Sequence, residues 1–303
     1  YGYLWDAIIS TYRFGLDGSF IVNRYIFTVT AGRSGQNTLT NLIENHVKHS
    51  YVAFEEPKID YIFKGKIASV ERKFRRSFIE THELLGRGKV LTSFVDGNVE
   101  YIESIAKKRV SIINKKMKKN GDQIYVDISK YFARGLHIGF QKILPTFSLI
   151  HLVRDPILNM RSFLNRNKNF YLDNNSPGAE SNLLRLDPNY LELSDLYLWA
   201  WFEMALRYEN MKQMECIDRY IEIYTDQLNS PDYMNQCLDD LGIVHNVIKE
   251  NHVRLNTNTG SGYKKTEITK YDIEKFEKFI DKVPSAIIDN IPYLQSYNPH
   301  SIY

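Results

Sequence analysis

Residues 24–42, RYIFTVTAGRSGQNTLTNL, most limit what this chain can fold into, because they join an apolar run, a turn with two glycines and a helix start. Residues 25–29 are all β-branched or aromatic, as in a buried parallel strand. From Leu39 onward, apolar residues return at helical spacing. Gly32 and Gly35 let the backbone curl so that successive N–H groups face one point, and the helix adds the positive end of its dipole. The segment therefore predicts a strand–turn–helix unit that binds an anion.

The turn differs from the loop that binds nucleoside triphosphates. That loop ends in Gly-Lys-Ser/Thr, whereas Gln36 follows Gly35 here and the cation of the turn is Arg33. The difference disfavours a small-molecule kinase, for which no magnesium-binding aspartate is obvious either. A basic residue, Ser, Gly and then polar residues that open a helix resemble instead the 5′-phosphosulfate loop of sulfotransferases. These enzymes use 3′-phosphoadenosine 5′-phosphosulfate (PAPS) as sulfuryl donor. The donor-binding residues that this resemblance implies in the turn are Gly32, Arg33, Ser34, Gly35, Gln36, Asn37 and Thr38.

A second segment, residues 148–166, has the same strand–turn–helix character and strengthens the resemblance. The apolar run 149–153 is followed by Arg-Asp-Pro, in which Asp155 is placed to cap the next helix. In the sulfotransferase pattern, an arginine at the end of such a strand and a serine eight residues later hold the 3′-phosphate. Arg154 and Ser162 have that spacing. A guanidinium and a hydroxyl on a rigid element suit a phosphate that carries nearly two negative charges.

The chain departs from the family pattern at two places. Gln36 and Asn37 stand where sulfotransferases prefer hydroxyl side chains, although amides also donate hydrogen bonds. The Arg-Lys-Gly closing loop of cytosolic sulfotransferases is replaced by a glycine-containing stretch, in which either Lys264 or Lys265 is a candidate to close over the donor. A plain surface loop is an equal alternative for that stretch. The first departure keeps open a catalytically silent nucleotide-binding scaffold.

The candidates for the general base are two glutamates and a histidine. Glu56, beside Pro57, resembles the catalytic glutamate of Golgi carbohydrate sulfotransferases and their bacterial and algal relatives, and we expect it to take the acceptor proton. Glu55 is the alternative if it is the residue that faces inward. His82 resembles the catalytic histidine of cytosolic sulfotransferases, and histidine as a residue type is chemically suited to act as a base. Residues 123–132 fit the expected strand position better than the segment around His82, so His82 becomes a substrate-pocket or strand-end residue.

The organisation of the chain predicts one α/β domain over residues 1–303, with 43% hydrophobic residues to build its core. Strands alternate with helical patterns, which predicts a P-loop-like, doubly wound parallel sheet flanked by helices, the sulfotransferase fold, with its ligand at the carboxyl ends of the strands. The predicted strands are 25–30, 50–54, 124–128, 148–153 and 221–224.

Three helical segments complete the expected fold. The aromatic stripe of residues 196–211 favours a core helix over an adenine platform. Residues 268–283 predict a terminal amphipathic helix with Tyr271 on its apolar side. The basic run that includes Lys107, Lys108 and Arg109 is expected to be a solvated helix face.

The whole pattern predicts transfer of the sulfuryl group from PAPS to a hydroxyl or amine, with PAP as product and no metal. Arg33 would stabilise the leaving phosphate. We expect a carbohydrate or small-molecule acceptor. A net charge of +3 does not favour nucleic acid, and no apolar run reaches membrane-spanning length. We favour a cytoplasmic location; because the chain begins at Tyr1, the alternative is a Golgi lumenal enzyme whose N-terminal anchor was removed.

Overall fold

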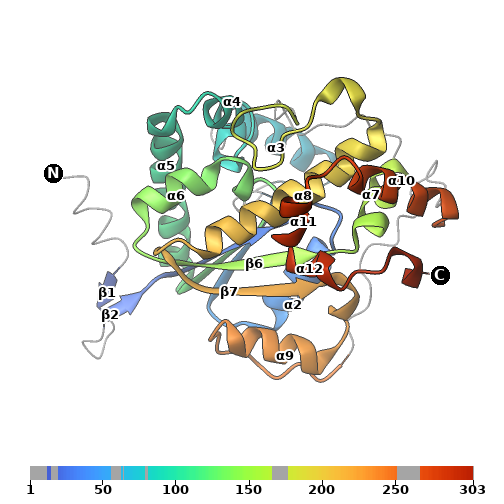
Figure 1. The fold of residues 1–303 in the computed structure, drawn as a ribbon. Coiled ribbons are helices and arrows are strands. Elements are labelled where there is room, and N and C mark those ends of the chain that lie inside the picture. The colour runs from blue at the N-terminus through green and yellow to red at the C-terminus, as the bar shows by residue number, and fades with distance from the viewer. Residues whose placement is uncertain are drawn as a thin grey trace.

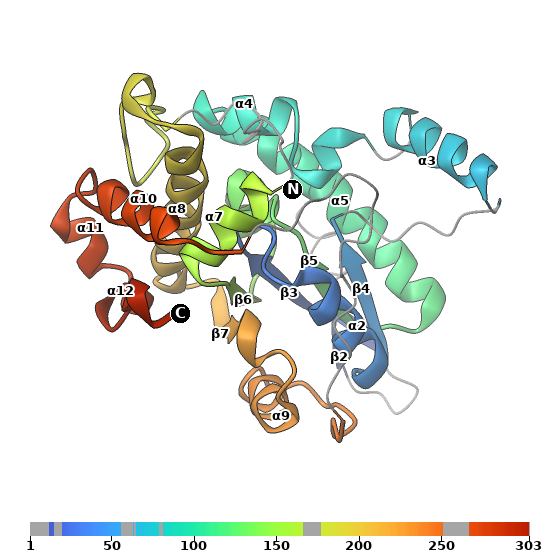
Figure 2. The ribbon, with the colours of Figure 1, turned by 90° about the vertical axis from the view of Figure 1, so that its right-hand side faces the viewer.

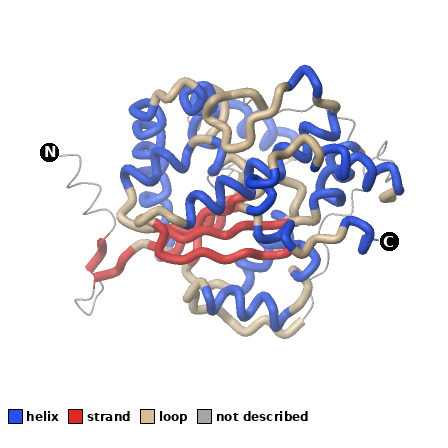
Figure 3. Tube along the Cα trace, viewed as in Figure 1, coloured by secondary structure: helices blue, strands red, loops and turns tan. Residues whose placement is uncertain are grey.

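The computed structural model describes residues 12–14, 20–55, 63, 65–78, 81–165, 177–250 and 267–302. A five-stranded parallel sheet forms its centre (Figure 3). The strand order is β4-β5-β3-β6-β7. The strands are β3 (Arg24–Val29), β4 (Ser50–Phe54), β5 (Ile124–Ile128), β6 (Phe147–Val153) and β7 (Ile217–Tyr224). The five predicted strands and the α/β class are confirmed. A short antiparallel pair, β1 (Tyr12–Phe14) and β2 (Phe20–Val22), precedes the sheet.

Helices cover both faces of the sheet, which gives three layers (Figure 1). One face packs against α2 (Gln36–His46) and α9 (Pro231–Asp240). The other face carries the larger core and most of the remaining helices. They are α4 (Lys89–Val95), α5 (Val99–Asn120), α6 (Leu136–Ile143), α7 (Pro156–Leu164), α8 (Leu193–Lys212), α10 (Lys270–Ile280), α11 (Ser285–Asp289) and α12 (Pro292–Gln295). In Figure 2, α3 (Lys66–Phe78) lies at the edge of the molecule, beyond α5.

The connections after β3 and β6 leave the sheet toward opposite faces. The two strands are hydrogen-bonded neighbours. The helix after β3, α2, places Leu39 and Leu42 in the core of one face, whereas the helix after β6, α7, places Ile157 and Met160 in the core of the other. In open α/β sheets, such a divergence leaves a crevice at the carboxyl ends of the strands, where ligands bind. Both segments predicted to bind the donor lie at this end of the sheet.

The aromatic stripe of α8 is core, as predicted, since Trp199, Phe202 and Tyr208 are fully buried. Two details of the predicted helices are wrong. Tyr271 is 56% exposed, because it lies beside the buried stripe of α10 rather than on it. Arg109 is buried within α5 and does not share the exposed face of Lys107 and Lys108. No helix in the described ranges is long and apolar enough to cross a membrane.

Candidate functional site

The turn after β3 adopts the curled backbone that its glycines predict. Gly32, Arg33 and Gly35 all have positive φ angles, of 92°, 60° and 83°. The turn is also closely packed: a Cβ atom on Gly35 would lie 2.6 Å from Leu228 Cδ1, and one on Gly32 would lie 3.1 Å from Lys130 Cδ. Glycine is therefore favoured at 32 by backbone conformation, and at 35 by both backbone conformation and space. We call residues 30–38 the cradle.

The two segments that the sequence relates to the donor phosphates meet in space. The Arg33 side chain donates from Nε to Ser162 Oγ over 3.2 Å. Arg154 donates from Nη1 to the backbone oxygen of Arg33 over 2.8 Å. Ser162 lies on the second turn of α7, and Arg154 directly follows β6, so these contacts join elements about 120 residues apart in the chain. Two guanidinium groups and a hydroxyl thus gather at the crevice.

Two residues that sequence reasoning missed hold the carbonyls of the cradle in place. Asn159, buried in α7, donates from Nδ2 to the Gly32 carbonyl over 2.7 Å. Thr225, which follows β7, donates from Oγ1 toward the Ser34 carbonyl at 2.8 Å, and the Val153 carbonyl lies 2.9 Å from the same oxygen. These contacts fix the orientation of the peptide groups that carry the Gly32 and Ser34 carbonyls.

Helix α2 begins at Gln36, immediately after the glycines. Gly35 occupies the N-cap position, where no side chain caps the first N–H groups. The Gln36 side chain is buried, and its Nε2 has no hydrogen-bond partner among the described residues. Asn37 and Thr38, the other two predicted donor-binding residues of this turn, are half-buried in the same turn of helix. An anion at this helix start would meet free backbone N–H groups, an amide donor and the positive end of the helix dipole.

The end of β4 supplies a carboxylate that is linked to the cradle. Glu55 follows β4 with a φ angle of 53°, and its Oε1 lies 3.4 Å from Lys130 Nζ. Lys130 follows β5, and its side chain is the group that a Cβ on Gly32 would touch. Sequence reasoning did not identify Lys130, although its place just past a central strand was a usable signal. Glu56 lies outside the described residues.

Two other predicted candidates do not join this constellation in the described residues. His82 is exposed and opens a 3₁₀ helix, His82–Leu85, so the strand-end interpretation of this histidine is wrong. Its carbonyl accepts the backbone N–H groups of Gly86 and Arg87, and no hydrogen bond or ion pair within the described ranges joins His82 to the cradle. Lys264 and Lys265, the lysines of the replaced closing loop, lie outside the described residues.

Hydrogen bonds from α8 and from the C-terminal segment hold the segment that carries Arg154 in place. Trp201 donates from Nε1 to the Arg154 carbonyl over 2.7 Å. Asp155 caps α7, as predicted, by accepting the Leu158 N–H through Oδ1, while Tyr297 donates its hydroxyl to Oδ2 over 2.7 Å. Burial raises the pKa of Asp155, and these two hydrogen bonds lower it only in part. The C-terminal segment thereby fixes the start of α7, and with it Ser162.

A buried ion pair lies beneath the sheet on the side of β5. Arg109 Nη2 donates to Asp127 Oδ2 over 2.7 Å and to the Tyr125 hydroxyl over 3.2 Å. Arg109 and Asp127 are almost completely inaccessible to solvent. Burial by itself would lower the pKa of Arg109, but the negative charge of Asp127 raises it, so Arg109 keeps its proton. This pair anchors α5 against β5 just before Ser129 and Lys130.

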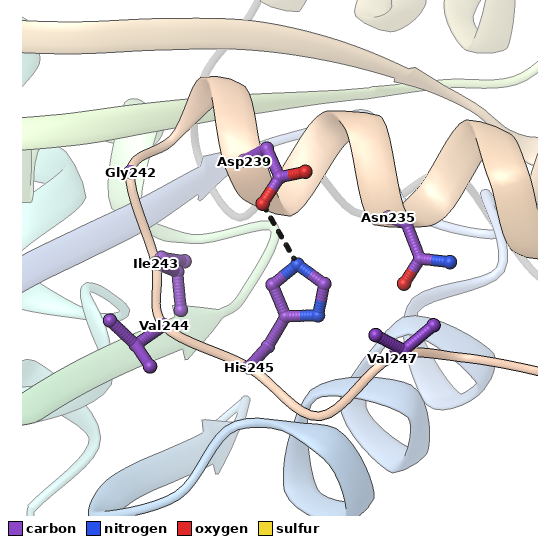
Figure 4. A pocket seen from close by; sticks show the side chains of 7 residues that line it. All are labelled: Asn235, Asp239, Gly242, Ile243, Val244, His245 and Val247. Atoms are coloured by element: carbon purple, nitrogen blue, oxygen red, sulfur yellow. Dashed lines mark hydrogen bonds and ion pairs between the residues drawn. The ribbon is translucent and has the colours of Figure 1, made fainter.

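A shallow pocket elsewhere is lined by residues 235–247, where His245 Nε2 lies 3.2 Å from Asp239 Oδ1 (Figure 4). Arg24, the first residue of β3, donates to the backbone oxygens of Leu241 and Gly242. The pocket therefore lies at the amino ends of the strands, opposite the cradle. Within the described ranges, no group of three or more His, Cys, Asp or Glu side chains is arranged to hold a metal ion.

The chain was compared with known proteins. No protein-family model matches it, and no curated protein matches it. Among solved structures it is similar to the sulfotransferase domain from the Synechococcus PCC 7002 olefin synthase, with 16% identity and a TM-score of 0.44. The match covers 86% of this chain and 96% of that domain. Because identity and TM-score are both low, the functional proposal below rests on the residues of this chain.

Proposed function

We propose that this protein is a sulfotransferase that moves the sulfuryl group of PAPS to a hydroxyl or amine of its acceptor. One observation carries the proposal: the turn that resembles a 5′-phosphosulfate loop and the segment that resembles a 3′-phosphate site touch through Arg33 Nε and Ser162 Oγ. The 5′-phosphosulfate and the 3′-phosphate of PAPS are joined to one ribose, so the groups that bind them would need to lie close together, as Arg33 and Ser162 do. A triphosphate site is disfavoured because Gln36 stands where a Walker loop has lysine.

The residues of the crevice fit a nucleotide that carries a phosphate at each end of its ribose. The unpartnered Gln36 Nε2 and the open start of α2 would bind the 5′-phosphosulfate. Arg154 and Ser162 would bind the 3′-phosphate by charge-assisted and hydroxyl hydrogen bonds. Arg33 would balance the charge that develops on the departing 5′-phosphate as sulfur–oxygen cleavage proceeds. Asn159 and Thr225 would position the cradle without contacting the nucleotide.

A glutamate after β4 would take the acceptor proton. We keep Glu56 as the base, with Glu55 as its direct rival, because the Glu55–Lys130 pair lies next to Gly32. Lys130 would hold an ionised glutamate beside the sulfuryl group and lower the cost of burying its charge. A carbohydrate or another polar small molecule is the acceptor class that the glutamate pattern favours.

Calorimetric titration with PAP, 5′-AMP and ATP tests donor recognition. We expect PAP to bind most tightly, since the 3′-phosphate meets Arg154. Ser162→Ala and Arg154→Ala should each weaken PAP binding by about 10- to 100-fold, the loss of a hydrogen bond to a charged phosphate, with a smaller effect on 5′-AMP. Arg185→Ala is the control, because Arg185 is exposed and its side chain donates to the nearby Glu180 carbonyl, away from the cradle contacts. Tight binding of ATP without PAP would refute the proposal.

Transfer of labelled sulfate from PAPS to a panel of glycans, phenols and amines tests catalysis and the base. Glu56→Gln should abolish transfer while PAP binding is retained. Loss of transfer in Glu55→Gln alone would move the base to Glu55. Loss in His82→Ala but not in Glu56→Gln would overturn a glutamate base. PAP binding with no transfer to any acceptor would favour a silent nucleotide-binding scaffold.

A further inference from the structure

Helix α3 presents a continuous apolar face to solvent. Ile67, Val70, Phe74 and Phe78 are spaced three or four residues apart, so they lie on one side of the helix. Their side chains are 60%, 69%, 55% and 74% exposed. The rings of Phe74 and Phe78 lie 4.9 Å apart and form one aromatic patch at the end of the helix. Large apolar side chains gathered in this way on a surface indicate an interaction site.

The rest of α3 is strongly basic. Residues 66–78 contain five Lys or Arg and one Glu, for a net charge of +4. By helical spacing, none of the five basic positions falls within the apolar stripe. Lys66 and Lys73 are exposed. A chain with a net charge of only +3 thus concentrates an excess of positive charge in one short helix.

The single acidic residue of α3 is already engaged. Glu71 accepts the Arg75 Nε–H at 3.0 Å through one oxygen and the backbone N–H of Phe63 at 3.1 Å through the other. Its side chain is only 9% exposed. Glu71 therefore adds little repulsion toward an anionic surface, and it holds a further aromatic residue, Phe63, close to the helix.

From these contacts we infer that α3 is an interfacial helix that binds the surface of a membrane rich in anionic lipid. Exposed phenylalanines beside lysines such as Lys66 and Lys73 let apolar side chains enter the boundary between headgroups and acyl chains while the cations meet lipid phosphates. Charge complementarity selects an anionic bilayer over a neutral one. Figure 2 shows α3 at the edge of the molecule, where a flat surface can reach it. The inference is independent of the proposed nucleotide site.

Co-sedimentation with vesicles tests this inference. The protein should bind vesicles of phosphatidylcholine mixed with phosphatidylserine, and should bind pure phosphatidylcholine at least tenfold more weakly. Phe74→Ser/Phe78→Ser should reduce binding by roughly 100-fold, as expected when two phenylalanines no longer enter an apolar phase. Tyr190→Ser/Tyr271→Ser removes two other exposed aromatic residues and should change nothing.

A second pair of double variants tests how much charge contributes to membrane binding. Lys66→Gln/Lys73→Gln should weaken binding to the mixed vesicles by about tenfold or more, since each cation near an anionic surface contributes severalfold. Lys118→Gln/Lys119→Gln removes two exposed lysines at the end of α5 and should have little effect. Equal losses in both pairs would mean nonspecific attraction and would overturn the inference.

Two further measurements separate the membrane from other occupants of the same face. The apolar face is exposed, so Phe74→Ser/Phe78→Ser should leave the Tm unchanged; a clear decrease would mean that the face is packed within the folded protein, against the inference. In sedimentation velocity, the wild type should not form a dimer that dissociates when Phe74 and Phe78 are replaced by Ser. Such a dimer, or absence of binding to anionic vesicles, would refute the membrane assignment.

Discussion

Replacement of Gly35 by alanine tests whether the cradle is shaped by packing as well as by backbone freedom. Gly35 has a φ angle of 83°, which an L side chain adopts at a cost of about 1–2 kcal/mol. The added Cβ would also lie 2.6 Å from Leu228 Cδ1 and 3.2 Å from Thr225 Cγ2. Relief of that overlap costs about 1–3 kcal/mol in a packed interior. Gly35→Ala should therefore lower the free energy of unfolding by about 2–5 kcal/mol.

Gly121 offers a matched control for the backbone part of this cost. It ends α5 with a φ angle of 76°, and no atom lies within 4 Å of the position that its Cβ would take. Gly121→Ala should cost only about 1–2 kcal/mol. Urea denaturation followed by circular dichroism gives both values. The difference between the two variants measures the overlap with Leu228 and Thr225.

The overlap can be relieved from the other side. Leu228 is buried, so Leu228→Ala alone should cost about 2–5 kcal/mol. In the Gly35→Ala background it should cost about 1–3 kcal/mol less than in the wild type, because it removes the atom that the new methyl group strikes. PAP affinity should fall in Gly35→Ala and remain in Gly121→Ala. The packing argument is refuted if the two glycine variants lose equal stability.

Four other variants test three buried groups by denaturation or thiol titration. Burial, helped by the charge of Arg207, lowers the pKa of His137 from 6.5 to about 3. Because the unfolded chain then binds a proton that the folded protein does not, the wild type should lose up to about 1.4 kcal/mol of stability per pH unit below 6.5. His137→Gln should flatten that slope. Arg109→Met should cost about 3–5 kcal/mol by leaving Asp127 unpaired, and Arg109→Met/Asp127→Leu should cost less. Burial raises the pKa of Cys237 to about 11, so a disulfide reagent near neutral pH should modify Cys216 first, and Cys216→Ser should remove that fast phase.

The sheet could be predicted from the sequence because each central strand is buried on both faces. Such strands are nearly continuous apolar runs, which stand out without an alignment. The edge strand β7 shows the limit of this signal. Its first half includes Asp218, Arg219 and Tyr220, which are exposed, so only residues 221–224 had the composition of a strand.

Arg109 was predicted to be exposed because it is charged, although its position in the helix favours burial. It lies three residues after Ala106 and four before Ile113, both of which are buried, so helical periodicity alone would have turned it inward. Its partner, Asp127, is in the middle of a predicted strand, where an isolated carboxylate needs a cation. An arginine at a buried helix position and a carboxylate within a strand could therefore have been predicted to form an ion pair.

The local sequence pattern could identify the cradle but not the side-chain contacts that hold its backbone in place. Arg33, Gly35 and Ser162 belong to recognisable strand–turn–helix units, and their meeting follows from the order of parallel strands. Thr225 comes from a third unit without any motif, and its bonds to Ser34 and Val153 depend on β7 pairing with β6. The contacts from Asn159 and Thr225 to the loop carbonyls fix the backbone of the loop whatever side chains Gln36 and Asn37 carry. For that reason Gln36 and Asn37 can replace the usual hydroxyls, provided that the backbone and Arg154 supply most of the binding energy, and substitution of either amide should weaken PAP less than Arg154→Ala does.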